Sequence, residues 1–134
     1  MSYSYVYGIQ SGLFIKIGVA SNIANRLRTM NLYNPHPCKI IARRQSVYAY
    51  YIEKRLHQTL SPYAIGREWF LIDPPLVRAA MTVVFRKVHE EMAAMLLANV
   101  RRGDEIEAKK AEQLKVHGVP KTPRRRRKLN VINA

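Results

Sequence analysis

Three side chains that could take part in phosphate chemistry lie on two helices that the sequence predicts. Arg26 is three residues after Ile23, so it borders the buried face of the first helix. Glu53 and His57 are four residues apart, which places them one turn apart on the flank of the second helix. A guanidinium binds two phosphate oxygens, a carboxylate binds Mg²⁺, and an imidazole exchanges protons near neutral pH. These three residues could instead have structural roles. Arg26 and Glu53 could form a salt bridge, and His57 could be a hydrogen-bonded histidine of the core.

The charge of the chain indicates a polyanionic partner. The 134 residues include 23 lysines and arginines but nine aspartates and glutamates, for a formal net charge of +14. Nucleic acid is the commonest polyanion inside a cell, so we expect DNA as the partner. We expect residues 117–134 to form a flexible basic tail. Five of its side chains are predicted to bind phosphates: Arg124, Arg125, Arg126, Arg127 and Lys128.

Cysteine content and hydropathy exclude several classes of protein. Cys38 is the only cysteine, so no internal disulfide forms, and the C-x-x-C spacing of many zinc sites is missing. No apolar run approaches the ~20 residues of a membrane span. The first residues lack the basic and apolar regions of a secretory signal. We therefore expect a cytoplasmic protein that is associated with DNA and not with a membrane.

The first two elements that would position the chemical groups form a β-hairpin. Apolar and polar residues alternate over 5–10 and again over 14–19, and Ser11-Gly12 supplies a turn between them. Tyr7 falls on the first strand and Lys16 on the second, across the hairpin. Strand tyrosines usually pack and strand lysines usually face solvent, so these two residues alone carry little functional information. A hairpin needs a packed face, which the following residues must supply.

Two helices and two further strands complete the first domain, residues 1–73. Ser21 is expected to cap the first helix, which carries Arg26 and the more outward Arg28, a candidate nucleic-acid contact. Ser46 is expected to open the second helix. The order β-β-α-β-α-β predicts an α+β fold with a three- to four-stranded, mainly antiparallel sheet flanked by helices. The expected elements are the helices 22–32 and 47–60 and the strands 38–42 and 68–72.

Asp73-Pro74-Pro75 predicts a break in the secondary structure, and we expect a helical, basic extension over 74–116 after it. Six apolar residues keep a helical spacing along an expected helix 76–98, which could pack on a second copy and form a homodimer. We expect a break over 99–103 and a further helix that a capping box at 104–107 opens. The six apolar residues are Val77, Met81, Val84, Val88, Met92 and Met95.

Five short motifs in the first half of the chain, taken in order, resemble the GIY-YIG nuclease domain. Tyr5-Val6-Tyr7 stands where that family has Gly-Ile-Tyr, and Lys16-Ile17-Gly18 stands where it has Tyr-Ile-Gly. Arg26 follows by eight residues, at the spacing of the family's helix-borne arginine, and Glu53 matches its acidic metal ligand. The Lys-Ile-Gly variant and the closing Gly66-Arg67-Glu68-Trp69-Phe70 are similar to a phage-type subgroup.

The resemblance implies a metal-dependent DNA endonuclease. Phosphodiester hydrolysis requires an activated water, charge relief on the phosphate oxygens and help for the leaving oxyanion. By the resemblance, Arg26 would hold the scissile phosphate and Glu53 would anchor Mg²⁺ or Mn²⁺. Tyr7 would act as the general base or orient the water, with Lys16 as a nearby cation that lowers its pKa. His57 would relay a proton or touch the phosphate.

The similarity over residues 5–72 leaves two other interpretations open. Lys16 replaces the family's second tyrosine, and Met30 occupies a position where many members have His or Tyr. A non-catalytic nucleic-acid-binding module with the same fold would keep the DNA contacts without the reaction. A structural protein that dimerises through the helix 76–98 would need neither the DNA contacts nor the reaction. The presence of Tyr7 and Glu53 favours the enzyme.

Overall fold

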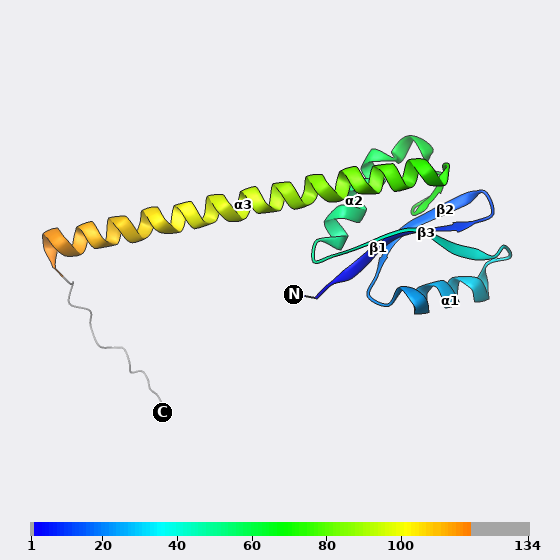
Figure 1. Ribbon diagram of the computed structural model, residues 1–134, viewed down its shortest axis with the longest axis horizontal. Helices are drawn as coiled ribbons and strands as arrows, with labels where there is room; N and C mark the ends of the chain where they lie inside the picture. The colour runs from blue at the N-terminus through cyan, green and yellow to red at the C-terminus, as the bar shows by residue number, and fades with distance from the viewer. Residues whose placement is uncertain (1, 119–134) are drawn as a thin grey trace, which may run out of the picture. The chain divides into compact units, whose positions relative to one another are not determined.

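The computed structural model describes residues 2–118, and these confirm the α+β class. A four-stranded antiparallel sheet carries helices on both faces (Figure 1). The order is the expected β-β-α-β-α-β followed by a long helix, with a short 3-10 helix before the last strand. The elements are β1 Ser4–Ser11, β2 Phe14–Ala20, α1 Ile23–Tyr33, β3 Cys38–Ser46, α2 Ala49–Thr59, η1 Ser61–Tyr63, β4 Trp69–Leu71 and α3 Pro74–His117.

The predicted hairpin forms the centre of the sheet, whose strand order is β3-β1-β2-β4. β1 and β2 pair in an antiparallel register that sets Tyr7 opposite Gly18 and Ile9 opposite Lys16. Gly12 takes a φ of 60° in the turn, a left-handed conformation that favours glycine. The hairpin therefore places Tyr7 and Lys16 on neighbouring strands and on the same face, at diagonal positions.

The two edges of the sheet differ in how far they are covered. β4 pairs with β2 over Phe14–Lys16, so no strand among residues 2–118 pairs with that side of β2 beyond Lys16. At the opposite edge, β3 pairs with β1 as far as Ser46. The sequence predicted that this strand would end at Ala42, and that prediction was wrong. Pairing with β1 extends the strand although its last residues before Ser46 are exposed and polar.

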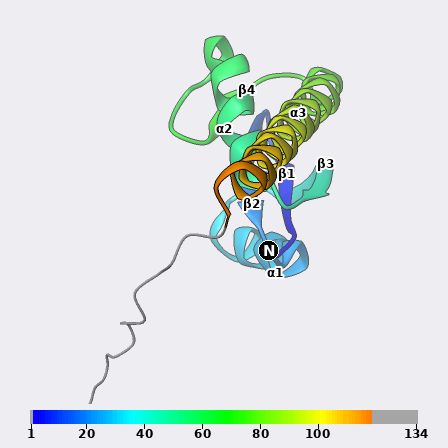
Figure 2. The same ribbon diagram turned by 90° about the vertical axis from the view of Figure 1, so that its left-hand side faces the viewer.

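The sheet separates two clusters of buried side chains, and helices lie on both of its sides (Figures 1 and 2). α1 covers the face that includes Tyr7, whereas α2 and the first turns of α3 cover the other face. Alternation along β1 explains the division, because Val6 and Tyr7 point to opposite faces. The α1 face buries Tyr7, Ile9, Ala20, Ile23, Met30 and Cys38. The opposite face buries Val6, Ile15, Ile17, Ile52, Leu56, Leu60, Phe70, Ile72, Val77, Met81, Val84 and Val88.

Both short helices begin differently from the prediction. The Asn22 side chain accepts from the backbone N–H of Asn25 over 3.0 Å, so Asn22 caps α1 and Ser21 does not. Ser46, expected to open the second helix, is the buried last residue of β3. Its Oγ accepts from the N–H of Tyr48 over 2.9 Å, which turns the chain toward α2. Local side-chain bonds to backbone therefore decide where each helix starts.

The long helix α3 is continuous, so the predicted break over 99–103 and the capping box at 104–107 were wrong. Gly103 costs a helix interior about 1 kcal/mol relative to alanine, but alanine, glutamate, lysine and arginine are common around it. The only two prolines of the helix are its first two residues, where proline is tolerated. Within residues 2–118, no helix is long and apolar enough to cross a membrane.

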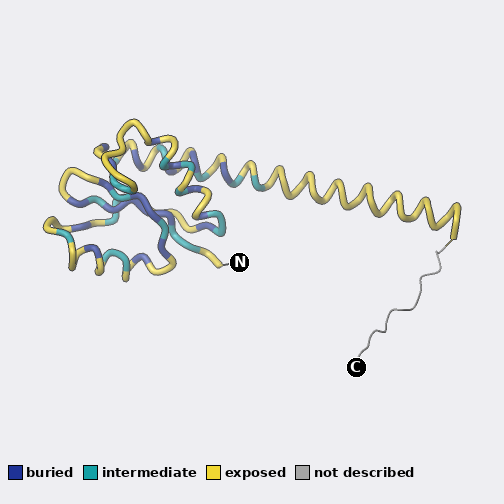
Figure 3. Tube along the Cα trace, turned by 180° about the vertical axis from the view of Figure 1, so that it is seen from behind, coloured by how far each residue is buried: buried dark blue, intermediate teal, exposed yellow. Residues whose placement is uncertain are grey.

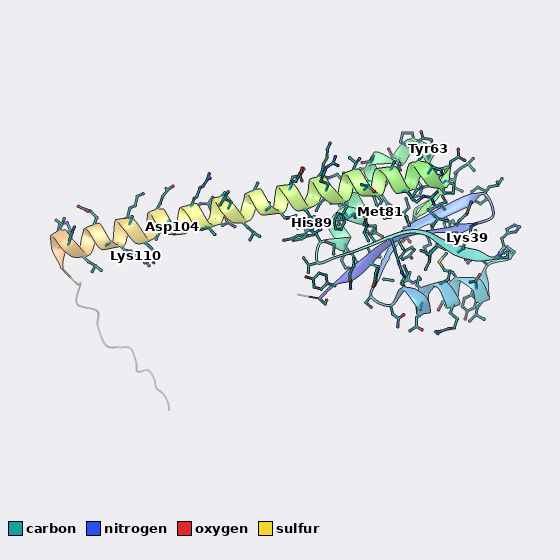
Figure 4. All side chains as sticks on the ribbon, in the orientation of Figure 1. Lys39, Tyr63, Met81, His89, Asp104 and Lys110 are labelled. Carbon is teal, nitrogen blue, oxygen red and sulfur yellow. The ribbon has the colours of Figure 1, made fainter. Side chains whose placement is uncertain are left out.

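The chain divides into two units between Ala93 and Ala94. In the first unit, four of the six apolar positions predicted for α3 are buried in the core. One of them is Met81, which is labelled in Figure 4 and is 2% exposed. In the second unit, every described residue, 94–118, is exposed (Figure 3). The amphipathic part of α3 is therefore the part that belongs to the first unit.

Candidate functional site

Tyr7 and Arg26 form the centre of the candidate site. Tyr7 lies in the middle of β1 and faces α1, where its side chain is buried. Arg26 on α1 donates from Nη1 to the hydroxyl oxygen of Tyr7 over 3.1 Å, and its Cζ lies 5.9 Å from the centre of the tyrosine ring. Because the arginine uses an acceptor position of the hydroxyl, the hydroxyl hydrogen remains available for another acceptor.

Gly18 makes room for the tyrosine ring. It is buried and lies opposite Tyr7 in the ladder between β1 and β2. A Cβ atom at this position would lie 2.6 Å from the hydroxyl oxygen of Tyr7 and 2.8 Å from its Cζ, well inside van der Waals contact. The hydroxyl therefore lies over the backbone of β2. This close approach explains on steric grounds why the Lys-Ile-Gly motif ends in glycine.

Lys16 and Glu68 add a pair of opposite charges beside β2. Lys16 Nζ lies 3.6 Å from Glu68 Oε1, and both side chains are partly exposed. The carbonyl of Glu68 accepts from the N–H of Ile17 over 3.0 Å, which holds the glutamate next to the strand. A solvent-accessible ion pair of this kind contributes at most about 1 kcal/mol to stability. Its main consequence is that the ammonium and carboxylate groups have defined positions near Tyr7.

α2 brings Glu53 and His57 to the side of β2 beyond the pairing with β4. His57 Nε2 donates to the carbonyl of Ile17 over 2.9 Å, and its ring lies edge-on to Phe70 with the ring centres 5.2 Å apart. A carbonyl only accepts, so Nε2 carries a proton and Nδ1 is the nitrogen left for proton exchange. Glu53 lies one turn before His57 and is half-buried.

Burial raises the pKa of Tyr7 above its ordinary value of 10.0. The Arg26 guanidinium opposes this rise through its charge and its hydrogen bond, whereas the carboxylates of Glu68 and Glu53 add to it. The hydroxyl is therefore protonated at neutral pH. In this form Tyr7 donates a hydrogen bond but does not accept a proton as a base.

Burial also raises the pKa of Glu53 above its ordinary value of 4.5. The positive charges of His57 and Lys16 oppose the rise, and the carboxylate of Glu68 adds to it. These mutual effects place the groups in one electrostatic environment, assembled from β1, β2, α1, α2 and the residue before β4. We call the following six residues the Tyr7 cluster: Tyr7, Lys16, Arg26, Glu53, His57 and Glu68.

The Tyr7 cluster contains all five residues predicted from the sequence to take part in the reaction, together with Glu68. The ion pairs found among residues 2–118 do not join Arg26 to Glu53, so that structural interpretation of the two residues loses its basis. Arg28 lies outside the cluster, exposed on α1, and donates to Asn25 Oδ1 over 2.7 Å. The predicted phosphate-binding residues Arg124, Arg125, Arg126, Arg127 and Lys128 lie outside the described residues.

Two features beside the cluster were not predicted. Arg43 is exposed on β3, directly opposite Tyr7 on the other side of β1. The strand expected from the sequence ended at Ala42, so no pattern indicated the face on which Arg43 lies. A polar hollow of about 190 Å³ also opens to solvent at the start of α1, and Arg26 is among its lining residues. Its lining residues are Ala20, Ser21, Asn22, Asn25, Arg26 and Thr29.

The described residues fit a metal ion that is shared with a substrate. No group of three or more His, Cys, Asp or Glu side chains within residues 2–118 is arranged to hold an ion. Mg²⁺ is usually bound through one or two carboxylates, and waters and phosphate oxygens complete its shell. Glu53 fits this pattern as one carboxylate ligand, with the charge of Glu68 nearby. The chain could therefore hold such an ion together with a phosphate.

The fold and the Tyr7 cluster define a small α+β domain that presents cations and a carboxylate around a buried tyrosine. The T5orf172 domain model matches residues 2–90, about two thirds of the chain. The chain therefore belongs to the T5orf172 domain family. This family is associated with GIY-YIG-like and HNH-type nucleases, and the match suggests a nuclease-like or DNA-binding module. No curated protein and no solved structure gives a match.

Proposed function

We propose that the chain is a metal-dependent endonuclease that hydrolyses DNA phosphodiester bonds at the Tyr7 cluster. The observation that carries this proposal is the 3.1 Å hydrogen bond that Arg26 donates to the hydroxyl of Tyr7. The carboxylate of Glu53 is close enough to Tyr7 to contribute to the rise of the tyrosine's pKa. Arg26 as the phosphate-binding cation, Tyr7 as the hydroxyl donor and Glu53 as the metal ligand would thereby act at one site. Membership of the T5orf172 domain family supports the same class of activity.

Arg26 would bind the scissile phosphate. Its guanidinium has five N–H donors in a planar fork, and the described contacts use one of them, on Tyr7. The hollow beside Arg26 gives a phosphate group a route to the remaining donors. Donors that are already in position stabilise the negative charge that develops on the phosphate oxygens in the transition state.

Tyr7 would orient the attacking water by donating its hydroxyl hydrogen. The raised pKa of Tyr7 disfavours removal of a proton from that water unless bound cations lower the pKa. Arg26 already acts in this direction, and a bound metal ion would add to it, whereas Lys16 is not among the groups that shift this pKa. The proposal therefore assigns Tyr7 the positioning of the water first, and proton abstraction only in the complex with metal and DNA.

Glu53 would hold Mg²⁺ or Mn²⁺ together with the phosphate. Such an ion, when bound, neutralises charge on the phosphate oxygens and makes a coordinated water more acidic. His57 would fix the turn of α2 that carries Glu53, since its Nε2 is bonded to the carbonyl of Ile17. Its Nδ1 would be the atom that exchanges a proton with the leaving group or with water.

Cleavage of plasmid DNA tests this proposal. The full-length chain is incubated with supercoiled plasmid and Mg²⁺ or Mn²⁺, beside Glu53→Ala. We expect nicked or linear DNA from the wild type and a rate at least about 100-fold lower from the variant, because a metal ligand is lost. Glu90→Ala, which removes an exposed carboxylate from α3, is the matched control and should cut like the wild type.

Three results would contradict the proposal in different ways. DNA binding without cleavage under every metal would exclude the nuclease and favour the non-catalytic binding module with the same fold. Cleavage that Glu53→Ala leaves unchanged would remove Glu53 from the site and point to a contaminating nuclease. A loss of cleavage shared by Glu90→Ala would mean that overall charge, and not the metal ligand, limits the rate.

A homodimer through α3 is a second proposal, which a different observation favours. Four of the six apolar positions predicted for this helix are buried in the protein's own core, so a partner would have to use the others. Exposed apolar side chains continue along the helix at Met95, Leu96, Leu97 and Val100. We expect a dimer by light scattering for the full chain and a monomer for Leu96→Glu. A monomeric wild type at micromolar concentration would exclude this assembly.

A further inference from the structure

Arg43 lies on the same face of the sheet as Tyr7. In the ladder between β1 and β3, Arg43 is directly opposite Tyr7, and Gln45 is opposite Tyr5. Directly opposite residues of an antiparallel pair point to the same face, at a Cα separation of about 5 Å. Arg43 therefore flanks Tyr7 on one side, as Gly18 and the rest of β2 flank it on the other.

The side chain of Arg43 lies against an aromatic ring, and its hydrogen-bond donors remain available to a ligand. Its Cζ lies 5.9 Å from the centre of the Tyr5 ring, at the diagonal position on β1. The side chain is exposed, and none of the ion pairs or hydrogen bonds given by side chains of residues 2–118 engages it. The guanidinium thus presents a planar fork of donors to solvent, the geometry that binds phosphate oxygens.

Arg44, the next residue, provides a contrast within the same strand. Alternation turns it to the opposite face, where its Nη2 donates to Thr82 Oγ1 over 3.2 Å. Its Cζ also lies 5.0 Å from the centre of the Phe85 ring on α3. Arg44 therefore fastens the edge strand to the helix. The two neighbouring arginines carry the same charge but have different surroundings.

The α1 face near β3 carries positive charge without a compensating acid. No aspartate or glutamate occurs in β1, α1 or β3. The cations on this side are Arg26, Arg28 and Arg43, while the carboxylates of the cluster lie at the β2 side with Lys16. Clefts and faces of one sign attract a polyanion and raise its local concentration.

We propose that Arg43, stacked on Tyr5, binds a second phosphate of the nucleic acid strand, beside the phosphate that Arg26 holds. The two phosphates then lie on the same side of the sheet, one at Arg26 on α1 and one at the edge strand β3. The inference rests on the proposed function, because Arg26 marks the phosphate at the centre. Contacts of this kind fix the position and direction of the strand and do not read its sequence.

The test compares matched arginine variants in DNA binding rather than in cleavage. Full-length wild type, Arg43→Ala, Arg44→Ala and Arg43→Lys are titrated with a labelled duplex in EDTA at several salt concentrations. Arg43→Ala should bind about tenfold more weakly near 0.1 M salt, with a salt slope flatter by about 0.9. Arg43→Lys should keep the slope, since its charge remains. Arg44→Ala should keep the slope too, although it should melt at a lower temperature.

The outcomes separate this inference from the proposed function. Equal losses of binding and slope for Arg43→Ala and Arg44→Ala would overturn the inference, because overall charge alone would explain them. Wild-type binding and slope in Arg43→Ala, with an unchanged melting temperature, would also overturn it. If the wild type binds DNA with the expected role of Arg43 but never cleaves it, the phosphate contact of Arg43 stands and the nuclease proposal fails.

Discussion

At the scale of single residues, the hydrogen bond between Arg26 and Tyr7 decides what the tyrosine can do. The arginine donates to the hydroxyl oxygen, and burial raises the pKa of Tyr7, so the hydroxyl hydrogen stays on the oxygen and remains available for a different acceptor. This arrangement suits a donor to water or phosphate. The tyrosine ring packs over Gly18 whether or not the hydroxyl oxygen is present. The role of the hydroxyl can therefore be tested separately from the packing of the ring.

Tyr7→Phe tests the hydroxyl alone. We expect a fall in single-turnover cleavage of about 100-fold, the loss typical of one positioned donor, because the water or phosphate is no longer oriented. DNA affinity should change by less than about threefold, since phosphate binding by Arg26 does not need the hydroxyl. Cleavage rates and a binding titration measure both quantities. A variant that cuts at the wild-type rate would remove Tyr7 from the reaction.

The pKa of Glu53 predicts how stability depends on pH. Burial raises this pKa above 4.5, so the charged carboxylate is disfavoured in the folded protein. Below pH 4.5 the group is protonated in both states, and its stabilising contribution is fully present; that contribution is lost as pH rises through the folded pKa. Glu53→Gln, which mimics the protonated form, should therefore melt at a higher temperature than the wild type at pH 7 and at the same temperature near pH 4.

Thermal melts in EDTA at the two pH values measure this difference. Glu90→Gln removes a carboxylate that is exposed on α3 and reports the effect of charge removal alone. If Glu53→Gln were less stable than the wild type at pH 7, its carboxylate would have to be stabilised by its neighbours more than it is disfavoured by burial. That result would contradict the stated direction of the pKa.

At the scale of secondary structure, the hairpin accommodates the Tyr7 side chain because β2 has a glycine, Gly18, opposite Tyr7. Gly18→Ala would place a Cβ 2.6 Å from the hydroxyl oxygen, so the ring or the strand has to move. We expect a destabilisation of about 1–3 kcal/mol, typical of overpacking, and a loss of cleavage. Urea unfolding and plasmid cleavage measure the two effects.

Gly66→Ala is the control for this substitution. A Cβ at Gly66 would have no neighbour within 4 Å, and its backbone is not in the left-handed region. We expect stability and cleavage close to those of the wild type. Equal losses at both glycines would mean that the effect of Gly18→Ala comes from the backbone and not from the contact with Tyr7.

The sequence predicted those elements whose pattern is carried by buried side chains. Alternation and a turn glycine gave the hairpin, and inward stripes gave α1 and α2, so the order of elements was correct. The end of β3 was missed because Arg43, Arg44 and Gln45 are all polar and only pairing with β1 makes them a strand. Because the strand was predicted to end at Ala42, Arg43 was not predicted to lie beside Tyr7. The break in α3 was wrong because Gly103 and an apparent cap are local signals, which the surrounding helix formers outweigh.

At the scale of the whole molecule, the basic end of the chain is expected to add affinity without specificity. Residues 119–134 lie outside the described residues and contain six lysines and arginines. Deletion of 119–134 should weaken DNA binding and flatten its salt slope by several units, at about 0.9 per phosphate contact. Binding titrations at several salt concentrations measure the slope. An unchanged slope would show that this segment does not neutralise phosphates.

The hydrogen bonds that assemble the Tyr7 cluster join residues far apart in the chain. Arg26 and Tyr7 are 19 residues apart, and His57 and Ile17 are 40 apart. Lys16 meets Glu68 only after β4 has joined the sheet. Contacts between such distant residues form late, when the intervening loops have closed. During synthesis, a chain that has not yet reached β4 therefore lacks a complete site, and cleavage activity would appear only once the whole first unit has folded.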